Sequence, residues 1–106
     1  MTMDMNKMLR QVQQMQADMV KAQDELANER VEASVGGGMV TVTATGSGEI
    51  VAIKISPEAI DPDDPETLED LVLAGVNQAL RNAQELAQSR LGGLTGGLEG
   101  LGLPGM

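Results

Sequence analysis

The first quarter of the chain carries apolar residues at spacings that alternate between three and four. They are Met5, Met8, Val12, Met15, Met19, Ala22 and Leu26. The average spacing of 3.5 residues is the repeat of a coiled-coil seam, and neither Gly nor Pro interrupts it. The pattern predicts a helix over residues 4–28, about 37 Å long at 1.5 Å per residue. A seam of that length needs a second chain, so we expect a homodimer interface at Met8, Val12, Met15 and Met19.

The apolar period changes to two near residue 30. Short alternating segments then run to residue 55, and the glycine-rich stretches 36–38 and 46–48 interrupt them. Glycine accepts positive φ, which tight hairpin turns require. Residues 30–55 are therefore predicted to form a three-stranded antiparallel sheet with one apolar face. In the third strand, we expect Val51, Ile53 and Ile55 on that face.

A second helix is predicted over residues 65–91. Asp64 is placed as its N-cap and Pro65 as its first residue. A wide apolar stripe then continues to Ala87, broad enough to cover one face of the sheet, and Gly75 on this stripe is expected to permit close packing. Upstream, residues 56–57 predict one further turn capped by Ser56.

These elements predict one α+β domain over residues 1–91, in the order helix, three-stranded antiparallel sheet, helix. The second helix is expected to end at Leu91, because two glycines follow. Residues 92–106 contain seven glycines and one proline. This composition predicts a disordered Gly/Leu-rich tail.

The amino-acid composition excludes most enzyme classes. It has 106 residues with no Cys, no His and no aromatic side chain. Thiolate metal sites, imidazole acid–base catalysis and base-stacking platforms are therefore excluded. We expect no catalytic residues, no cofactor, no metal site and no membrane span. Three aspartates at residues 61–64 invite a cation site, but turn and cap chemistry accounts for them.

The net charge of −9 is distributed unevenly. Residues 56–70 contain seven acids and no base, whereas residues 1–23 carry three bases and two acids, a local charge of +1. The bases there are Lys7, Arg10 and Lys21, and Arg81 and Arg90 lie on the polar side of the second helix. Their spacing alone indicates only that all five cations lie on solvent-exposed faces of the two helices.

Several stretches together resemble the YbaB/EbfC family of bacterial nucleoid-associated proteins. They are MLRQVQQMQ at 8–16, GMVTV at 38–42, IKISP at 53–57, DDPETLEDL at 63–71, Asn77 with Ala79, and the leucine–glycine tail. These stretches occur in the family's order and cover nearly the whole chain. Each is weak alone, and the combination is specific.

The resemblance implies a tweezer-like homodimer in which the long N-terminal helices project from a shared body. It also implies binding of double-stranded DNA with low sequence specificity, in the cytoplasm at the nucleoid. Lys7, Arg10 and Lys21, with Arg81 and Arg90, are then the expected DNA contacts. The resemblance leaves open whether replication or repair proteins also bind.

A protein-interaction scaffold or holdase is the alternative interpretation. A methionine-rich seam can accept varied apolar surfaces, and a heptad helix with a small sheet superficially resembles a prefoldin subunit. Prefoldin, however, would need two matched heptad helices, and the second stripe here is wide and directed at the sheet.

Overall fold

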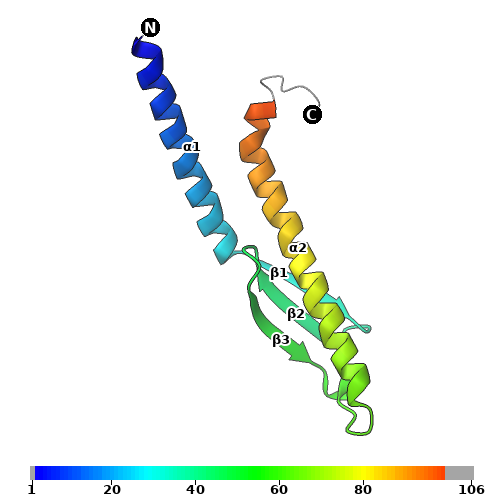
Figure 1. The fold of residues 1–106 in the computed structure, drawn as a ribbon. Helices are drawn as coiled ribbons and strands as arrows, with labels where there is room; N and C mark the ends of the chain where they lie inside the picture. Colours follow the sequence, from blue (N-terminus) through cyan, green and yellow to red (C-terminus); the bar gives the residue numbers. More distant parts are fainter. Residues whose placement is uncertain (1, 100–106) are drawn as a thin grey trace.

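The computed structural model describes residues 2–99, and the side-chain surroundings of residues 4–92 (Figure 1). The elements are α1 (Thr2–Asn28), β1 (Arg30–Val35), β2 (Val40–Thr45), β3 (Ile50–Ile55), the 3₁₀ turn η1 (Pro57–Ala59) and α2 (Pro65–Glu99). The strands form one antiparallel sheet in the order β1-β2-β3. This is the predicted α+β arrangement.

α2 packs across the face formed by β1 and β2. The register pairs Ala33 with Val42, and Val42 with Ile53, so these side chains share one face of the sheet. The buried core consists of Ala33, Val40, Val42, Ala44, Ala79 and Ala83. Four of these six residues are alanines, so the helix lies close to the strands.

α2 approaches the sheet closely at Gly75. A Cβ added there would lie 2.8 Å from Cγ2 of Val42, which is completely buried. This contact confirms the close packing expected from the sequence. At Gly92, by contrast, an added Cβ meets no atom within 4 Å.

Gly75→Ala is therefore expected to destabilise the protein despite its better helix propensity. Overpacking costs about 1–3 kcal/mol and the propensity gain is about 1 kcal/mol, so the melting temperature should fall by roughly 5 °C. Gly92→Ala is the matched control and should raise the melting temperature slightly. Thermal unfolding followed by circular dichroism tests the pair; equal increases in both variants would contradict the close packing.

β3 lies mostly outside the cover of α2. The register shifts between Thr43 and Ala44, so that Ile50 pairs with Ala44 and Val51 forms a bulge. The expectation that Val51 would lie on the apolar face was therefore wrong, because the bulge puts Ile50 there instead. Ile53 shares that face yet is 45% exposed, which leaves an uncovered apolar strip along β3.

The turns partly follow the predicted chemistry. Asp64 caps α2, since its carboxylate accepts hydrogen bonds from the Thr67 backbone N–H (3.4 Å) and hydroxyl (2.6 Å). Ser56 precedes the single turn η1 as predicted, but its side chain makes no capping hydrogen bond. Of the two glycines in residues 46–48, only Gly48 has a positive φ. Gly46 instead permits the close approach of the chain to Leu26 at the base of α1.

α2 continues to Glu99, eight residues beyond the predicted end at Leu91. Glycine lowers helix propensity but removes no backbone donor, and extending a long helix requires no new nucleation. Gly92 and Gly93 therefore do not stop it. The remainder of the predicted tail, residues 100–106, lies outside the described residues.

The molecule is strongly elongated, at 75 × 29 × 16 Å. Its radius of gyration is 20.4 Å, whereas a compact chain of about 100 residues has about 13 Å. The difference arises because α1 projects away from the body formed by the sheet and α2 (Figure 1).

Candidate nucleic-acid interface

The projecting helix α1 carries the first group of candidate contacts. Lys7, Arg10 and Lys21 are all exposed on it. Arg10 and Lys21 are eleven residues apart, which places them within about 20° on the same helix face and about 16 Å apart along the axis. Lys7 lies one turn before Arg10, so the three cations form a line along one side of α1.

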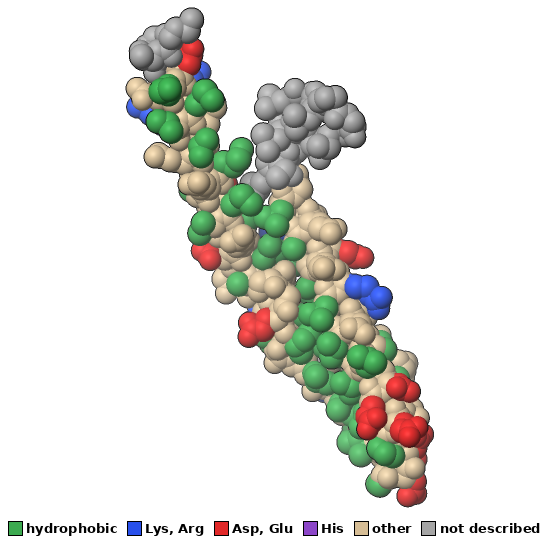
Figure 2. Space-filling view, viewed as in Figure 1, with side chains coloured by type: hydrophobic (Ala, Val, Ile, Leu, Met, Phe, Trp, Pro, Cys, Tyr) green, Lys and Arg blue, Asp and Glu red, His purple; other side chains and the backbone are tan. Residues whose placement is uncertain are grey.

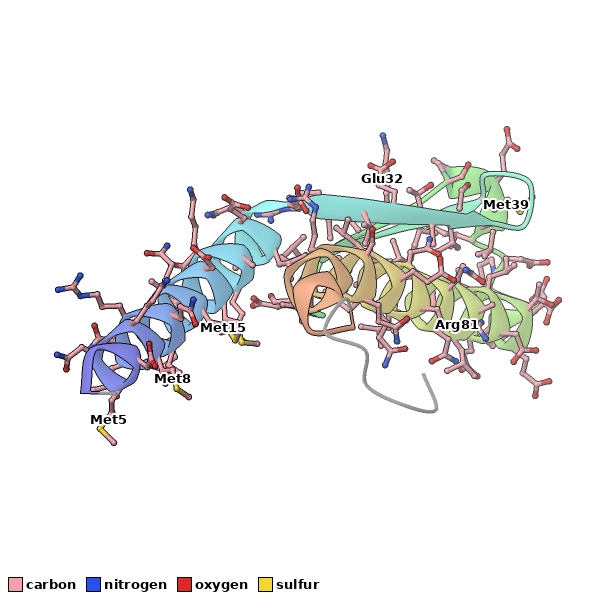
Figure 3. The ribbon with its side chains drawn as sticks, turned by 90° about the horizontal axis from the view of Figure 1, so that it is seen from above. Met5, Met8, Met15, Glu32, Met39 and Arg81 are labelled. Carbon is pink, nitrogen blue, oxygen red and sulfur yellow. The ribbon has the colours of Figure 1, made fainter. Side chains whose placement is uncertain are left out.

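The apolar stripe lies on a different side of α1. Met5, Met8 and Met15 project from one side of the helix (Figure 3). By helical geometry, Arg10 and Lys21 lie about 180° from the centre of this stripe. The stripe is exposed along most of its length: Met8 63%, Val12 52%, Met15 43% and Met19 38%. Only Leu26, at its base, is buried.

The acidic residues of 56–70 gather at the opposite end of the molecule. All seven are exposed. They lie on η1, on the start of α2 and on the loop between them, and Figure 2 shows them clustered at the end away from the α1 tip. Asp61 and Asp64 bind nearby backbone N–H groups there. Among the described residues, no acidic cluster is arranged to hold a metal ion.

Arg81 lies on the body and is separate from the α1 cations (Figure 3). It is exposed and lines a groove of about 540 Å³ between α2 and the turn at residues 46–48. Asn77 and Gln84 line the same groove from the neighbouring turns of α2.

Arg90 has a different environment from the other candidate cations. Its guanidinium contacts the carboxylate of Glu29 and lies 3.8 Å from that of Glu25. Together with Lys21 and Asp18, Arg90 and Glu25 line a groove of about 250 Å³ between α1 and α2. The structure thus brings Lys21 and Arg90 together, and each has acidic neighbours.

Sequence reasoning did not identify Glu25 and Glu29 as partners of Arg90. Glu25 and Glu29 are 65 and 61 positions before Arg90 in the sequence, and only the packing of α1 beside α2 brings them together. The sequence shows locally only that Glu25 and Glu29 are four residues apart and so lie near each other at the end of the helix. This spacing does not indicate that a distant arginine contacts them.

The family model of the YbaB/EbfC DNA-binding family matches residues 1–98. A nucleoid-associated protein of Ruminiclostridium cellulolyticum is 54% identical over 97% of this chain and 88% of its own length. Others from Pelotomaculum thermopropionicum and Streptomyces avermitilis are 50% and 52% identical over 97% of this chain, and 95% and 91% of their own lengths.

Among solved structures, the uncharacterized protein HP0035 from Helicobacter pylori has a similar fold. The TM-score is 0.70 at 19% identity, and the match covers 79% of this chain and 88% of that one. At this identity the likeness concerns the fold alone. In the part of the chain that the structure describes, none of the helices is both long and apolar enough to cross a membrane.

Proposed function

The chain belongs to the YbaB/EbfC DNA-binding family, and we propose on that basis that it binds double-stranded DNA as a nucleoid-associated homodimer. The observation that supports this most strongly is the separation of charge along the molecule. The cations of α1 lie on the projecting helix, whereas the seven acids of residues 56–70 lie at the far end of the body. Before Asp18, the projecting part of α1 carries Lys7 and Arg10 against Asp4 alone, so a protein with a net charge of −9 still presents a locally basic surface to phosphates.

The proposed DNA contacts are Lys7, Arg10 and Lys21 from α1, with Arg81 as a contact from the body. Arg90, the fifth contact expected from the sequence, is left out of this set, because it would have to leave Glu25 and Glu29 to reach a phosphate. No base-specific arrangement of Asn, Gln or Arg side chains is needed for phosphate binding. We accordingly propose low sequence specificity and a role in nucleoid organisation or gene regulation.

The homodimer is proposed from the apolar surface that a single chain leaves exposed. The α1 stripe at Met8, Val12, Met15 and Met19 is one part of this surface. A second part lies on β3, where Ile53 on the apolar face is 45% exposed and Val51 in the bulge is 44% exposed. Covering apolar area is the main driving force of association, and pairing two chains doubles the number of α1 cations presented to DNA.

Affinity should be modest and strongly dependent on salt. Two copies of three α1 cations neutralise about six phosphates, which gives a slope of log affinity against log salt near −5. Non-specific binding of this kind has dissociation constants of about 10⁻⁴ to 10⁻⁶ M at physiological salt.

A fluorescence-anisotropy titration tests this function. Purified protein is titrated into labelled duplexes of unrelated sequence and into one matching single strand, at several salt concentrations. We expect similar affinities for the duplexes, the slope given above, and weaker binding to the single strand, because the chain has no aromatic residue to stack on bases. Absence of duplex binding at about 50 mM salt, where counterion release is most favourable, would contradict the proposal.

A protein-interaction scaffold or holdase is the second candidate function. The exposed methionines of α1 favour it, because flexible thioether side chains adapt to varied apolar partners. A holdase should suppress aggregation of an unfolding client protein in the absence of DNA, and light scattering measures this directly.

A further inference from the structure

The base of α1 is held to the body by a small set of contacts. Leu26 is buried, and a Cβ added at Gly46 would lie 2.8 Å from the Leu26 carbonyl oxygen, so only glycine permits this approach. The Gly46 N–H donates to the Glu29 carbonyl at 3.2 Å, and the Glu29 N–H donates to the Leu26 carbonyl at 3.1 Å. These contacts fix where α1 ends, and above them only the turns of α1 from Asp18 onward lie against α2.

The ion pairs of Arg90 add a second point of attachment. Arg90 lies on α2, whereas Glu25 lies in the last turn of α1 and Glu29 lies just beyond its end. The second carboxylate oxygen of Glu29 is buried and accepts no hydrogen bond from any described residue. Arg90 pairs with the other oxygen of this carboxylate, whereas Arg30 donates to the backbone carbonyl of Glu29.

The direction in which α1 projects from the body depends on contacts at more than one place along the helix. Every described residue of α1 before Asp18 is exposed, so the projecting part of the helix has no contact that would hold it in one direction. α1 is 27 residues long, about 40 Å. A rotation of 15° at its base would move its tip by about 10 Å over that length.

We propose that Arg90, through Glu29 and Glu25, is a positioning residue that sets the angle between α1 and the body. In the proposed DNA-binding dimer, this angle determines how far apart the two rows of α1 cations lie. Arg90 then acts on DNA binding by orienting α1, the arm of the molecule, and not by contacting phosphate. The angle itself belongs to the protein without DNA, so this inference can be tested separately from the proposed function.

The three side chains are 42%, 51% and 31% exposed for Arg90, Glu25 and Glu29, respectively. Ion pairs this exposed contribute little to folding stability. Loss of Arg90 should therefore hardly change the melting temperature, while it changes the distribution of arm angles. A purely structural role in folding would give the opposite pattern.

The experiment measures the arm directly. The natural chain has no cysteine, so Gln16→Cys on α1 and Glu69→Cys on α2, both at exposed positions, give two specific spin-label sites. Labelled protein is diluted into an excess of unlabelled protein, so that pulsed electron–electron double resonance records only distances within one chain. The same labelled pair is combined with Arg90→Gln, Arg90→Lys, Glu29→Gln and Arg81→Gln.

We expect a narrow distance distribution in the parent and in Arg81→Gln, which removes the same charge from the same helix. Arg90→Gln and Glu29→Gln should at least double the width of the distribution, and Arg90→Lys should restore part of the narrowing. Melting temperatures should stay within a few degrees of the parent value. Identical distributions in Arg90→Gln and the parent would overturn the inference.

DNA titration separates this role from direct contact. If Arg90 contacts phosphate, Arg90→Gln lowers the affinity with unchanged distances, and Glu29→Gln raises it by removing a negative charge; that result would also overturn the inference. If Arg90 positions the arm, both variants lower the affinity. Should the parent bind no DNA at all, the distance measurements still decide the role of Arg90.

Discussion

Replacing Arg10 by Glu is expected to weaken duplex binding about 60-fold at 0.1 M salt. Arg10 lies on the exposed α1 face that also carries Lys21, and the dimer presents it twice. Each phosphate contact contributes about 0.9 to the slope of log affinity against log salt, so losing two contacts removes about 1.8 logarithmic units between 0.1 and 1 M. The salt slope should fall in magnitude by about 2, and anisotropy titrations at several salt concentrations measure both quantities.

Lys54→Glu is the matched control for Arg10→Glu. It makes the same change of charge at an exposed position near the end of β3. Lys54 pairs with Thr41, on the face of the sheet away from α2. If DNA lies along α1, the DNA affinity of this variant should fall only a few-fold, because the added negative charge weakens the long-range electrostatic attraction to DNA. Equal losses in the two variants would contradict binding by the projecting helix.

Met15→Asp is expected to weaken the dimer by at least 100-fold. Met15 is 43% exposed in the single chain, so an aspartate there costs the folded monomer little. In the paired stripe, by contrast, each chain would place an unpaired carboxylate in an apolar contact, at a cost of about 2 kcal/mol or more per carboxylate. Two such costs exceed the 2.8 kcal/mol that corresponds to 100-fold. Sedimentation equilibrium at micromolar concentration measures the change.

Two variants show which apolar surface joins the chains. Gln13→Asp places the same charge at an exposed position of α1 that lies about 130° from the centre of the stripe, and it should leave the dimer intact. Ile53→Asp places it on the exposed strip of β3. A parent protein that sediments as a folded monomer would contradict the dimer itself. A dimer broken by Ile53→Asp and unchanged by Met15→Asp would contradict the α1 stripe as the interface.

The order and type of the elements were predictable because each has a local cause. The 3-4 spacing from Met5 to Leu26 permits one amphipathic helix, and the alternation from Val40 to Ala44 permits one half-buried strand. Asp64 followed by Pro65 fixes the start of α2 within its own first turn. These signals involve residues that are neighbours in sequence, so a single sequence contains them.

The features that were missed depend on contacts between distant residues. The bulge at Val51 results from the register of β3 against β2, which alternation alone does not specify. The attachment of Arg90 to Glu29 depends on where α1 emerges from the body. For the candidate site, the sequence located the cations of α1, but it did not show that Arg90 faces two carboxylates while Arg81 lines an open groove.

The acidic end of the molecule has a consequence for how coated DNA should behave in bulk. If α1 faces the duplex, the seven carboxylates of residues 56–70 point outward, so the outer surface of a protein-covered duplex is itself negative. Two such complexes repel one another at separations within a few Debye lengths, about 8 Å each at physiological ionic strength. The protein is then expected to keep neighbouring duplexes apart and dispersed, whereas a uniformly basic protein would bridge and condense them.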